Sequence, residues 1–97
     1  MDIQKYLLYI TQIEVKRLNS SKIRGVTAYW KGNVACLSFY FNGAITEEDL
    51  ESASDTCTYI ISHFPDGLLE ENYIRLDYPK PIPQNFLAYS KEDLNNS

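Results

Sequence analysis

The side chains best suited to chemistry in this sequence are carboxylates, and they are concentrated in one stretch of the chain. Residues 32–74 contain no lysine or arginine. Their acidic residues are Glu47, Glu48, Asp49, Glu51, Asp55, Asp66, Glu70 and Glu71. Residues 1–31 carry a net positive charge, so the overall charge of −4 conceals an uneven distribution. A concentrated acidic region attracts a basic partner and speeds its association. The alternative is that the acids at 47–49 only complement a helix dipole and keep the protein soluble.

Catalysis and metal binding are not indicated by the remaining reactive side chains. The only histidine, His63, is expected near the end of a helix, where the helix dipole favours it. Cys57 lies six residues earlier, about 240° around the helix axis, so the two side chains do not share a face. The sequence also lacks CxxC, HExxH and glycine-rich phosphate-binding patterns. We therefore predict a protein without enzymatic activity, cofactor or bound metal.

Tyrosines and one further acid complete the candidate binding residues. Tyr29 and Tyr40 are expected on the sheet face that does not form the core, and exposed tyrosine is typical of protein interfaces. The alternative is that they are partly buried tyrosines that cover the sheet. Asp77 shares a strand face with Arg75, so a local ion pair is the alternative to partner contact. The predicted partner-binding residues are Glu47, Glu48, Glu51, Asp55, Glu70, Glu71, Tyr29, Tyr40 and Asp77.

Two amphipathic helices are predicted to hold these groups in place. Apolar residues recur at helical spacing over residues 3–18, after Asp2 as the N-cap. A second helix is predicted over residues 47–64. Thr46 caps this helix, Asp49 completes a capping box, and the run 65–67 (Pro-Asp-Gly) ends it.

A β-hairpin is predicted between the two helices, with strands at 26–30 and 34–41 around a Gly32-Asn33 turn. This turn pairs Trp30 with Ala35, Ala28 with Leu37 and Val26 with Phe39, which places all six side chains on the core face. A third strand is expected at 73–78, after a connector at 68–72. Proline then alternates at 79, 81 and 83, which indicates an extended arm and not a central strand. A short fourth strand can follow at 86–89, and the tail from 91 is expected to fray.

The element order α-β-β-α-β, with or without a further strand, indicates the α+β class. Each helix has one apolar stripe and the sheet has one apolar face. The economical arrangement is a two-layer sandwich, in which both helices cover one face of an antiparallel sheet of three or four strands. We predict a single domain over residues 1–97.

Compartment and ligand classes follow from composition. The N-terminus lacks the features of a signal peptide, and no apolar run approaches the ~20 residues that span a bilayer. Cys36 and Cys57 are the only cysteines, which indicates buried or free thiols in a reducing compartment. The negative charge argues against direct binding to nucleic acid. We therefore expect a cytoplasmic protein that binds neither a membrane nor nucleic acid.

Short runs along residues 24–83 also resemble a known group of proteins. These runs are Arg24-Gly25-Val26 to Trp30, Phe39-Tyr40-Phe41-Asn42-Gly43, Thr46-Glu47-Glu48-Asp49, Ala53-Ser54, Ile60-Ile61, Phe64-Pro65 and Ile74-Arg75-Leu76-Asp77-Tyr78-Pro79-Lys80-Pro81. They resemble the small bacterial immunity proteins of colicin-like and contact-dependent growth-inhibition toxin systems. The resemblance implies a cytosolic protein that binds and blocks a cognate toxin C-terminal domain. Such toxins are often nucleases with a basic cleft, which an acidic face would cover by imitating phosphate charge.

A different interpretation remains open at this point. The chain can instead be a small interaction or adaptor domain without a toxin partner, either monomeric or a weak homodimer. Its contacts would then be made by the face with Tyr29 and Tyr40 and by the proline-edged third strand.

Overall fold

Both predicted helices form and begin at their predicted caps in the computed structural model, which describes residues 2–91. α1 (Ile3–Leu18) begins after Asp2, whose carboxylate accepts a 2.9 Å hydrogen bond from the backbone N–H of Gln4. The helix ends at Asn19, which adopts the left-handed conformation that commonly closes a helix. Among these residues no helix is long and apolar enough to cross a bilayer.

The capping box of α2 (Glu47–Ile61) is also confirmed. Thr46 Oγ1 accepts a 3.1 Å hydrogen bond from the N–H of Asp49, and the Asp49 carboxylate accepts a 2.8 Å bond from the N–H of Thr46. The helix ends at Ile61, three residues before its predicted end. His63 and Phe64 follow in a tighter turn, because their N–H groups bond to carbonyls three residues back and residue 65 is proline.

The hairpin between the helices has the predicted register. β1 (Ile23–Lys31) and β2 (Val34–Phe41) are antiparallel and pair Trp30 with Ala35 and Ala28 with Leu37. β1 begins three residues earlier than predicted, and a register shift between Ile23 and Gly25 marks a bulge.

The prediction of an antiparallel sheet is wrong for one strand. The sheet is mixed, in the order β3-β2-β1-β4, and β3 (Leu68–Arg75) runs parallel to β2. α2 carries the chain back along the sheet, so β3 starts level with the start of β2 and Leu68 pairs with Val34. β3 includes residues 68–72, which were expected to be a connector, and it ends at Arg75, three residues before its predicted end.

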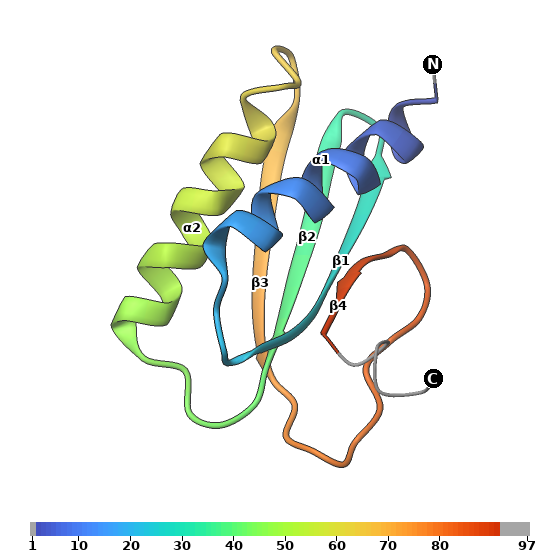
Figure 1. Ribbon diagram of the computed structural model, residues 1–97. Coiled ribbons are helices and arrows are strands. Elements are labelled where there is room, and N and C mark those ends of the chain that lie inside the picture. The colour runs from blue at the N-terminus through green and yellow to red at the C-terminus, as the bar shows by residue number, and fades with distance from the viewer. Residues whose placement is uncertain (1, 92–97) are drawn as a thin grey trace.

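The core lies between the sheet and the two helices, which cover one sheet face as predicted (Figure 1). Inward residues of β2 alternate with half-buried ones, as expected for a strand with one covered face. The fully buried side chains include Leu7, Val26, Leu37, Phe39, Phe41, Ala53, Cys57 and Ile60.

Thr11 is a polar exception within this core. It lies on the inward side of α1 with no exposed surface, and its Oγ1 is the one buried side-chain polar atom of residues 2–91 without a hydrogen-bond partner. A buried hydroxyl without a partner costs about 1–3 kcal/mol. We expect Thr11→Val, which keeps the shape, to raise the free energy of unfolding by about 1 kcal/mol in urea titrations. Thr11→Ala, which does not keep the shape, is the control. A lower free energy of unfolding in Thr11→Val would show that the Thr11 hydroxyl has a hydrogen-bond partner.

The proline-rich segment passes around the end of the sheet, beside Asn42 and Gly43, and then packs over Gly25 on the open face, which is the face without helices. Residues 76–86 lead from β3 at one edge to β4 (Leu87–Ser90) at the other, where β4 pairs antiparallel with β1. The prolines therefore lie outside the sheet, and the short fourth strand is confirmed. Ile82 is only 5% exposed because it packs over Gly25. Predictions for the tail beyond Lys91 fall outside the described residues.

The close approach of this segment to β1 requires glycine at position 25. A Cβ at this position would lie 2.7 Å from Ile82 Cδ1 and 3.2 Å from the Tyr89 carbonyl oxygen. Because part of this contact is backbone, we expect Gly25→Ala to lower the free energy of unfolding by about 1–3 kcal/mol in urea titrations. Ser38→Ala, at a half-buried position of the same sheet face, is the control. A stability loss no larger than that of the control would contradict this packing.

Candidate protein-binding surface

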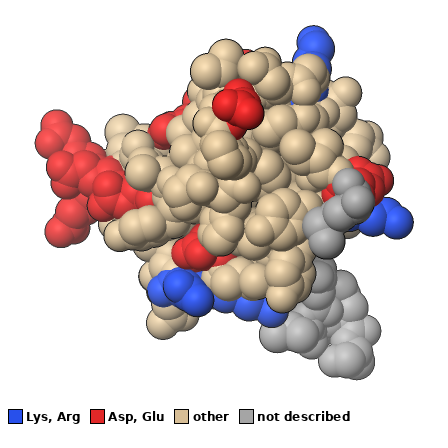
Figure 2. Space-filling view, turned by 90° about the horizontal axis from the view of Figure 1, so that it is seen from above, with Lys and Arg blue, Asp and Glu red and all other residues tan. Residues whose placement is uncertain are grey.

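The four predicted acids of α2 lie together on its outer face. Glu47, Glu48, Glu51 and Asp55 are all exposed, and at 100° per residue they fall within an arc of about 100° opposite the buried stripe. Figure 2 shows acidic side chains projecting from the left side of the molecule, where α2 and β3 lie in Figure 1. We call these four residues the acidic face. α2 carries no lysine or arginine in its length.

The two acids of β3 lie on opposite sides of the sheet. Successive strand residues point to opposite sides of a sheet. Glu71 points toward α2, where its carboxylate accepts hydrogen bonds from Tyr73 and, at 3.5 Å, from Ser54. Glu70 pairs in register with Cys36 on the open sheet face and accepts a 3.3 Å bond from Asn72. Glu71 therefore joins α2 to β3, whereas Glu70 remains exposed.

The tyrosines lie on the open sheet face, as their alternation predicted. Tyr29 is 41% exposed and Tyr40 is half-buried. The Tyr29 ring is 4.5 Å from the ring of Phe86, measured between centroids. This face lies across the sheet from the helices. The candidate residues therefore divide between two surfaces, a helix side with the acidic face and a sheet side with Tyr29, Tyr40 and Glu70.

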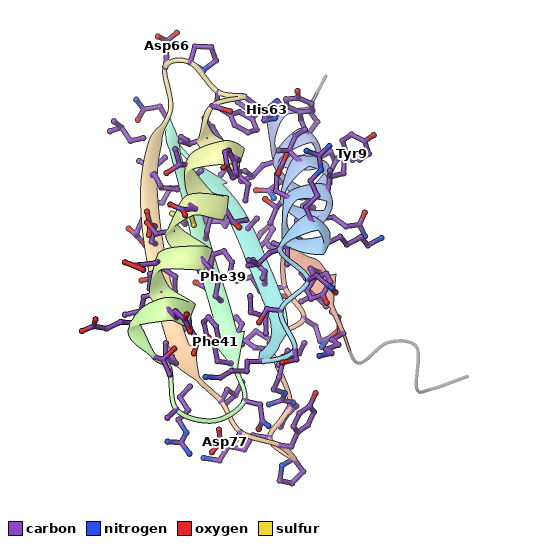
Figure 3. The ribbon with its side chains drawn as sticks, turned by 60° about the vertical axis from the view of Figure 1, so that its left-hand side comes forward. Tyr9, Phe39, Phe41, His63, Asp66 and Asp77 are labelled. Atoms are coloured by element: carbon purple, nitrogen blue, oxygen red, sulfur yellow. The ribbon has the colours of Figure 1, made fainter. Side chains whose placement is uncertain are left out.

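Asp77 is held by local contacts, which was the alternative to partner binding. Arg75 Nε lies 3.1 Å from both carboxylate oxygens, and the Gly43 N–H donates a 2.7 Å bond to Oδ1. These partners, Arg75 first, hold the pKa of Asp77 below its ordinary value. Figure 3 places Asp77 at the opposite end of the molecule from His63 and Asp66. Asp77 stabilises the turn after β2.

A buried arginine was missed by sequence reasoning. Arg24 at the start of β1 is only 2% exposed. Its guanidinium donates to the carbonyls of Leu76 and, at 2.6 Å, Lys80, and its Cζ lies 4.1 Å from the centroid of the Tyr78 ring. The sequence feature that could have indicated a buried arginine is the position of Arg24, directly before Gly25 in an apolar strand. Arg24 anchors the segment that joins β3 to β4.

The start of α2 is fixed to the start of β1 by an ion pair. Lys22 Nζ donates to the Asp49 carboxylate and, at 2.5 Å, to the Ala44 carbonyl. The hydrogen bond from Lys22 and then that from the Thr46 N–H hold the pKa of Asp49 below its ordinary value. Asp49 points toward this contact and is therefore not part of the acidic face.

This ion pair makes stability depend on pH. A carboxylate with a lowered folded pKa stabilises the fold above its unfolded pKa of about 4, and this contribution is lost as the pH falls through the lower folded value. We expect Asp49→Asn to lower the free energy of unfolding by about 1–2 kcal/mol at pH 7, and this gap to close toward pH 2.5. Glu51→Gln is the control, since Glu51 is exposed on the same helix. A gap that stayed constant with pH would contradict the assignment.

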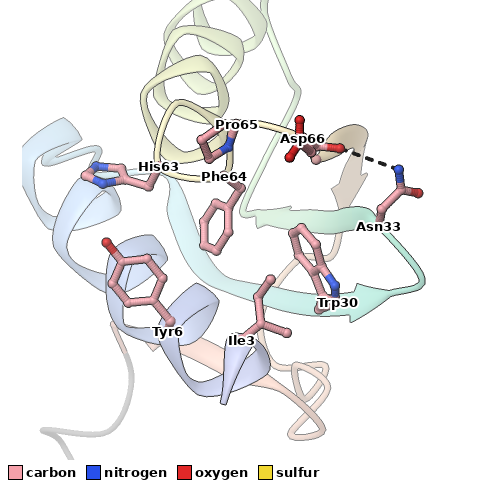
Figure 4. A pocket seen from close by; sticks show the side chains of 9 residues that line it. Ile3, Tyr6, Trp30, Asn33, His63, Phe64, Pro65 and Asp66 are labelled. Atoms are coloured by element: carbon pink, nitrogen blue, oxygen red, sulfur yellow. Dashed lines mark hydrogen bonds between the residues drawn. The ribbon is translucent and has the colours of Figure 1, made fainter. Parts of the chain in front are cut away.

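An apolar pocket of about 370 Å³ lies beside the start of α1 (Figure 4). It is walled by aromatic rings, among them Tyr6, Trp30 and Phe64, and the Trp30 and Phe64 centroids are 5.2 Å apart. His63 at its rim makes an edge contact with Tyr6, with 6.4 Å between the ring centroids.

Within residues 2–91, no three His, Cys, Asp or Glu side chains are grouped to hold a metal ion. Cys57 and Cys36 are free thiols, and burial raises the pKa of Cys57 to about 12.

These features define a small α+β domain whose distinctive surfaces are suited to contact with another protein. A comparison with protein-family models then gives the family. Residues 15–91 match the MafI2 immunity protein model, and the chain belongs to this family. A comparison with curated proteins finds no match. The resemblance to small bacterial immunity proteins of polymorphic toxin systems is thereby confirmed, and it supports a role in toxin immunity.

Proposed function

We propose that this protein neutralises a cognate bacterial toxin by binding the toxin's C-terminal domain through the acidic face. Family membership supports the immunity role. The observation that carries the mechanism is the set of four exposed carboxylates on one side of α2, a helix without basic residues. Opposite charges attract, so contact between the acidic face and a basic surface of the toxin is favourable. The same attraction steers the toxin toward the acidic face and speeds association.

The target class proposed here is a nuclease. A nuclease must bind phosphates, so its substrate cleft is lined with lysine and arginine. Glu47, Glu51 and Asp55 follow one another at four-residue intervals, about 6 Å apart along the helix axis. A row of negative charges on a rigid helix can occupy such a cleft in place of the nucleic acid. The immunity protein then excludes the substrate and needs no cofactor, and it does not bind nucleic acid itself.

The cytoplasm is the compartment proposed for this inhibition. Both cysteines are free thiols, as expected where glutathione keeps thiols reduced. We propose that the protein acts there as a monomer or weak homodimer.

Growth rescue and enzyme inhibition test this proposal together. A toxin domain identified from the genes that neighbour this one is expressed with and without the protein. Then the purified toxin domain is assayed on RNA and DNA with increasing amounts of the protein. We expect restored growth and loss of nuclease activity at a one-to-one ratio. Absence of rescue would contradict immunity, whereas rescue from a toxin without nuclease activity would contradict only the target class.

A further inference from the structure

A groove between the two helices lies directly beside the acidic face. It encloses about 530 Å³, and the side chains that line it include Glu14 and Arg17 of α1 and Ser52, Asp55, Tyr59 and His63 of α2. Asp55 belongs both to the acidic face and to the groove. The two features therefore form one continuous surface on the helix side of the molecule.

The charges of the groove favour a positively charged occupant. Its acids are Glu14 and Asp55, and its one arginine or lysine is Arg17. Neither carboxylate forms an ion pair within residues 2–91, where the ion pairs are Lys22–Asp49 and Arg75–Asp77. Both carboxylates are therefore available to a further cation from outside the chain.

An aromatic ring stands beside these carboxylates. Tyr59 lies one helical turn after Asp55 on the same side of α2, and it is 61% exposed. The face of a tyrosine ring attracts an ammonium or guanidinium group, and more strongly when the pair is shielded from water. An aromatic ring and two carboxylates together can bind an arginine or lysine side chain, through contact with the ring and charge-assisted hydrogen bonds to the carboxylates.

We propose that the groove between α1 and α2 receives a lysine or arginine side chain of the toxin, with Tyr59 as the residue that contributes most to affinity. This inference rests on the proposed function, because the cation belongs to the basic surface that meets the acidic face. The cation lies against the Tyr59 ring and pairs with Asp55 and Glu14. The interface is then centred on the helix side, and the tyrosines of the open sheet face are outside it.

The chain offers a matched control for Tyr59. Tyr9 of α1 is 60% exposed, nearly the same as Tyr59, but it does not line the groove. Figure 3 shows Tyr9 projecting outward from α1. The substitutions Tyr59→Ala and Tyr9→Ala remove the same side chain at the same exposure and on the same side of the sheet. Of the two tyrosines, only Tyr59 lines the groove.

Calorimetric titration of the cognate toxin domain into these variants tests the inference. We expect Tyr59→Ala to weaken binding about 30-fold or more, as is typical of a central interface residue. Tyr59→Phe, which keeps the ring, should stay within about threefold, and Tyr9→Ala within about twofold. Glu14→Gln should weaken binding about fivefold, because it removes one charged partner of the cation.

The outcomes separate this inference from the proposed function. If Glu47→Lys/Glu48→Lys/Glu51→Lys abolishes binding while Tyr59→Ala has no more effect than Tyr9→Ala, the groove assignment is overturned and the acidic face stands. A greater loss in Tyr29→Ala than in Tyr59→Ala overturns it as well, since the interface is then the open sheet face. If the unaltered protein does not bind the toxin, both proposals fail.

Discussion

Reversing the charge of the acidic face, with Glu47→Lys, Glu48→Lys, Glu51→Lys and Asp55→Lys, is expected to weaken toxin binding by about 1,000-fold or more. Placing like charges against each other in an interface costs several kcal/mol, and each 1.4 kcal/mol is a factor of ten in affinity. The association rate should fall most, because the steering field is inverted. Binding of the unaltered protein should weaken as salt is raised, and this dependence should be smaller in the variant.

The variant is expected to remain folded. All four side chains are exposed, and none is hydrogen-bonded to the rest of residues 2–91. Lysines in the first turn oppose the helix dipole, so a loss of about 1–2 kcal/mol in stability is expected from Glu47→Lys and Glu48→Lys. Circular dichroism should show an unchanged spectrum at 25 °C, which excludes unfolding as the cause of lost binding.

A control variant tests whether the loss of affinity depends on the acids of α2 in particular. Asp66→Lys with Glu70→Lys also makes the protein more basic, but these exposed acids lie in the turn after α2 and on the open sheet face. This double variant should bind within about fivefold of the unaltered protein. Glu47→Lys with Glu51→Lys changes the net charge by the same amount as this control. Equal losses in these two double variants would mean that net charge, and not the acidic face, determines affinity.

The largest expected change in stability comes from Arg24→Met. Methionine fills part of the same volume, but the carbonyls of Leu76 and Lys80 lose their donor and the Tyr78 ring loses its cation. Hydrogen bonds from a charged group contribute about 1.5–3 kcal/mol each, and both of these bonds are partly shielded from water. We expect the free energy of unfolding to fall by about 3 kcal/mol or more, out of about 5–15 kcal/mol for a domain of this kind.

Urea denaturation and hydrogen exchange together test this role of Arg24. Amides of residues 76–86 should lose protection first, because this segment is held over the sheet by Arg24. Arg75→Met is the matched control, since Arg75 is exposed and pairs only with Asp77 among its described contacts. It should cost less than about 1 kcal/mol. A higher free energy of unfolding in Arg24→Met would contradict this role. It would mean that the cost of burying the guanidinium charge exceeds the stabilisation that its hydrogen bonds and ring contact provide.

The parts of the fold that depend on local sequence were predictable. The two helices follow from their caps and apolar spacing, and the hairpin register follows from a Gly32-Asn33 turn that separates buried from half-buried residues. The direction of β3 depends on how distant segments connect. The signal was nevertheless present, because a strand, a helix and a strand in succession form the crossover that joins parallel strands.

The candidate site was predictable in composition but not in arrangement. Glu70 and Glu71 are adjacent in the sequence, yet their strand places them on opposite sides of the sheet. The anchoring role of Arg24 could not be predicted from the sequence, because its partners lie more than fifty residues away and only the folded chain brings them together. The groove containing Tyr59 likewise requires the packing of two helices, which periodicity alone does not position.

Amide chemical-shift mapping of the isotope-labelled protein, titrated with the cognate toxin domain, tests the central claim most directly. We predict the largest changes along α2, from Glu47 to Tyr59, and on the groove side of α1 around Glu14. Amides of the open sheet face, at Tyr29, Tyr40 and Glu70, should keep their positions. Changes centred on that open sheet face, with α2 unaffected, would contradict the account.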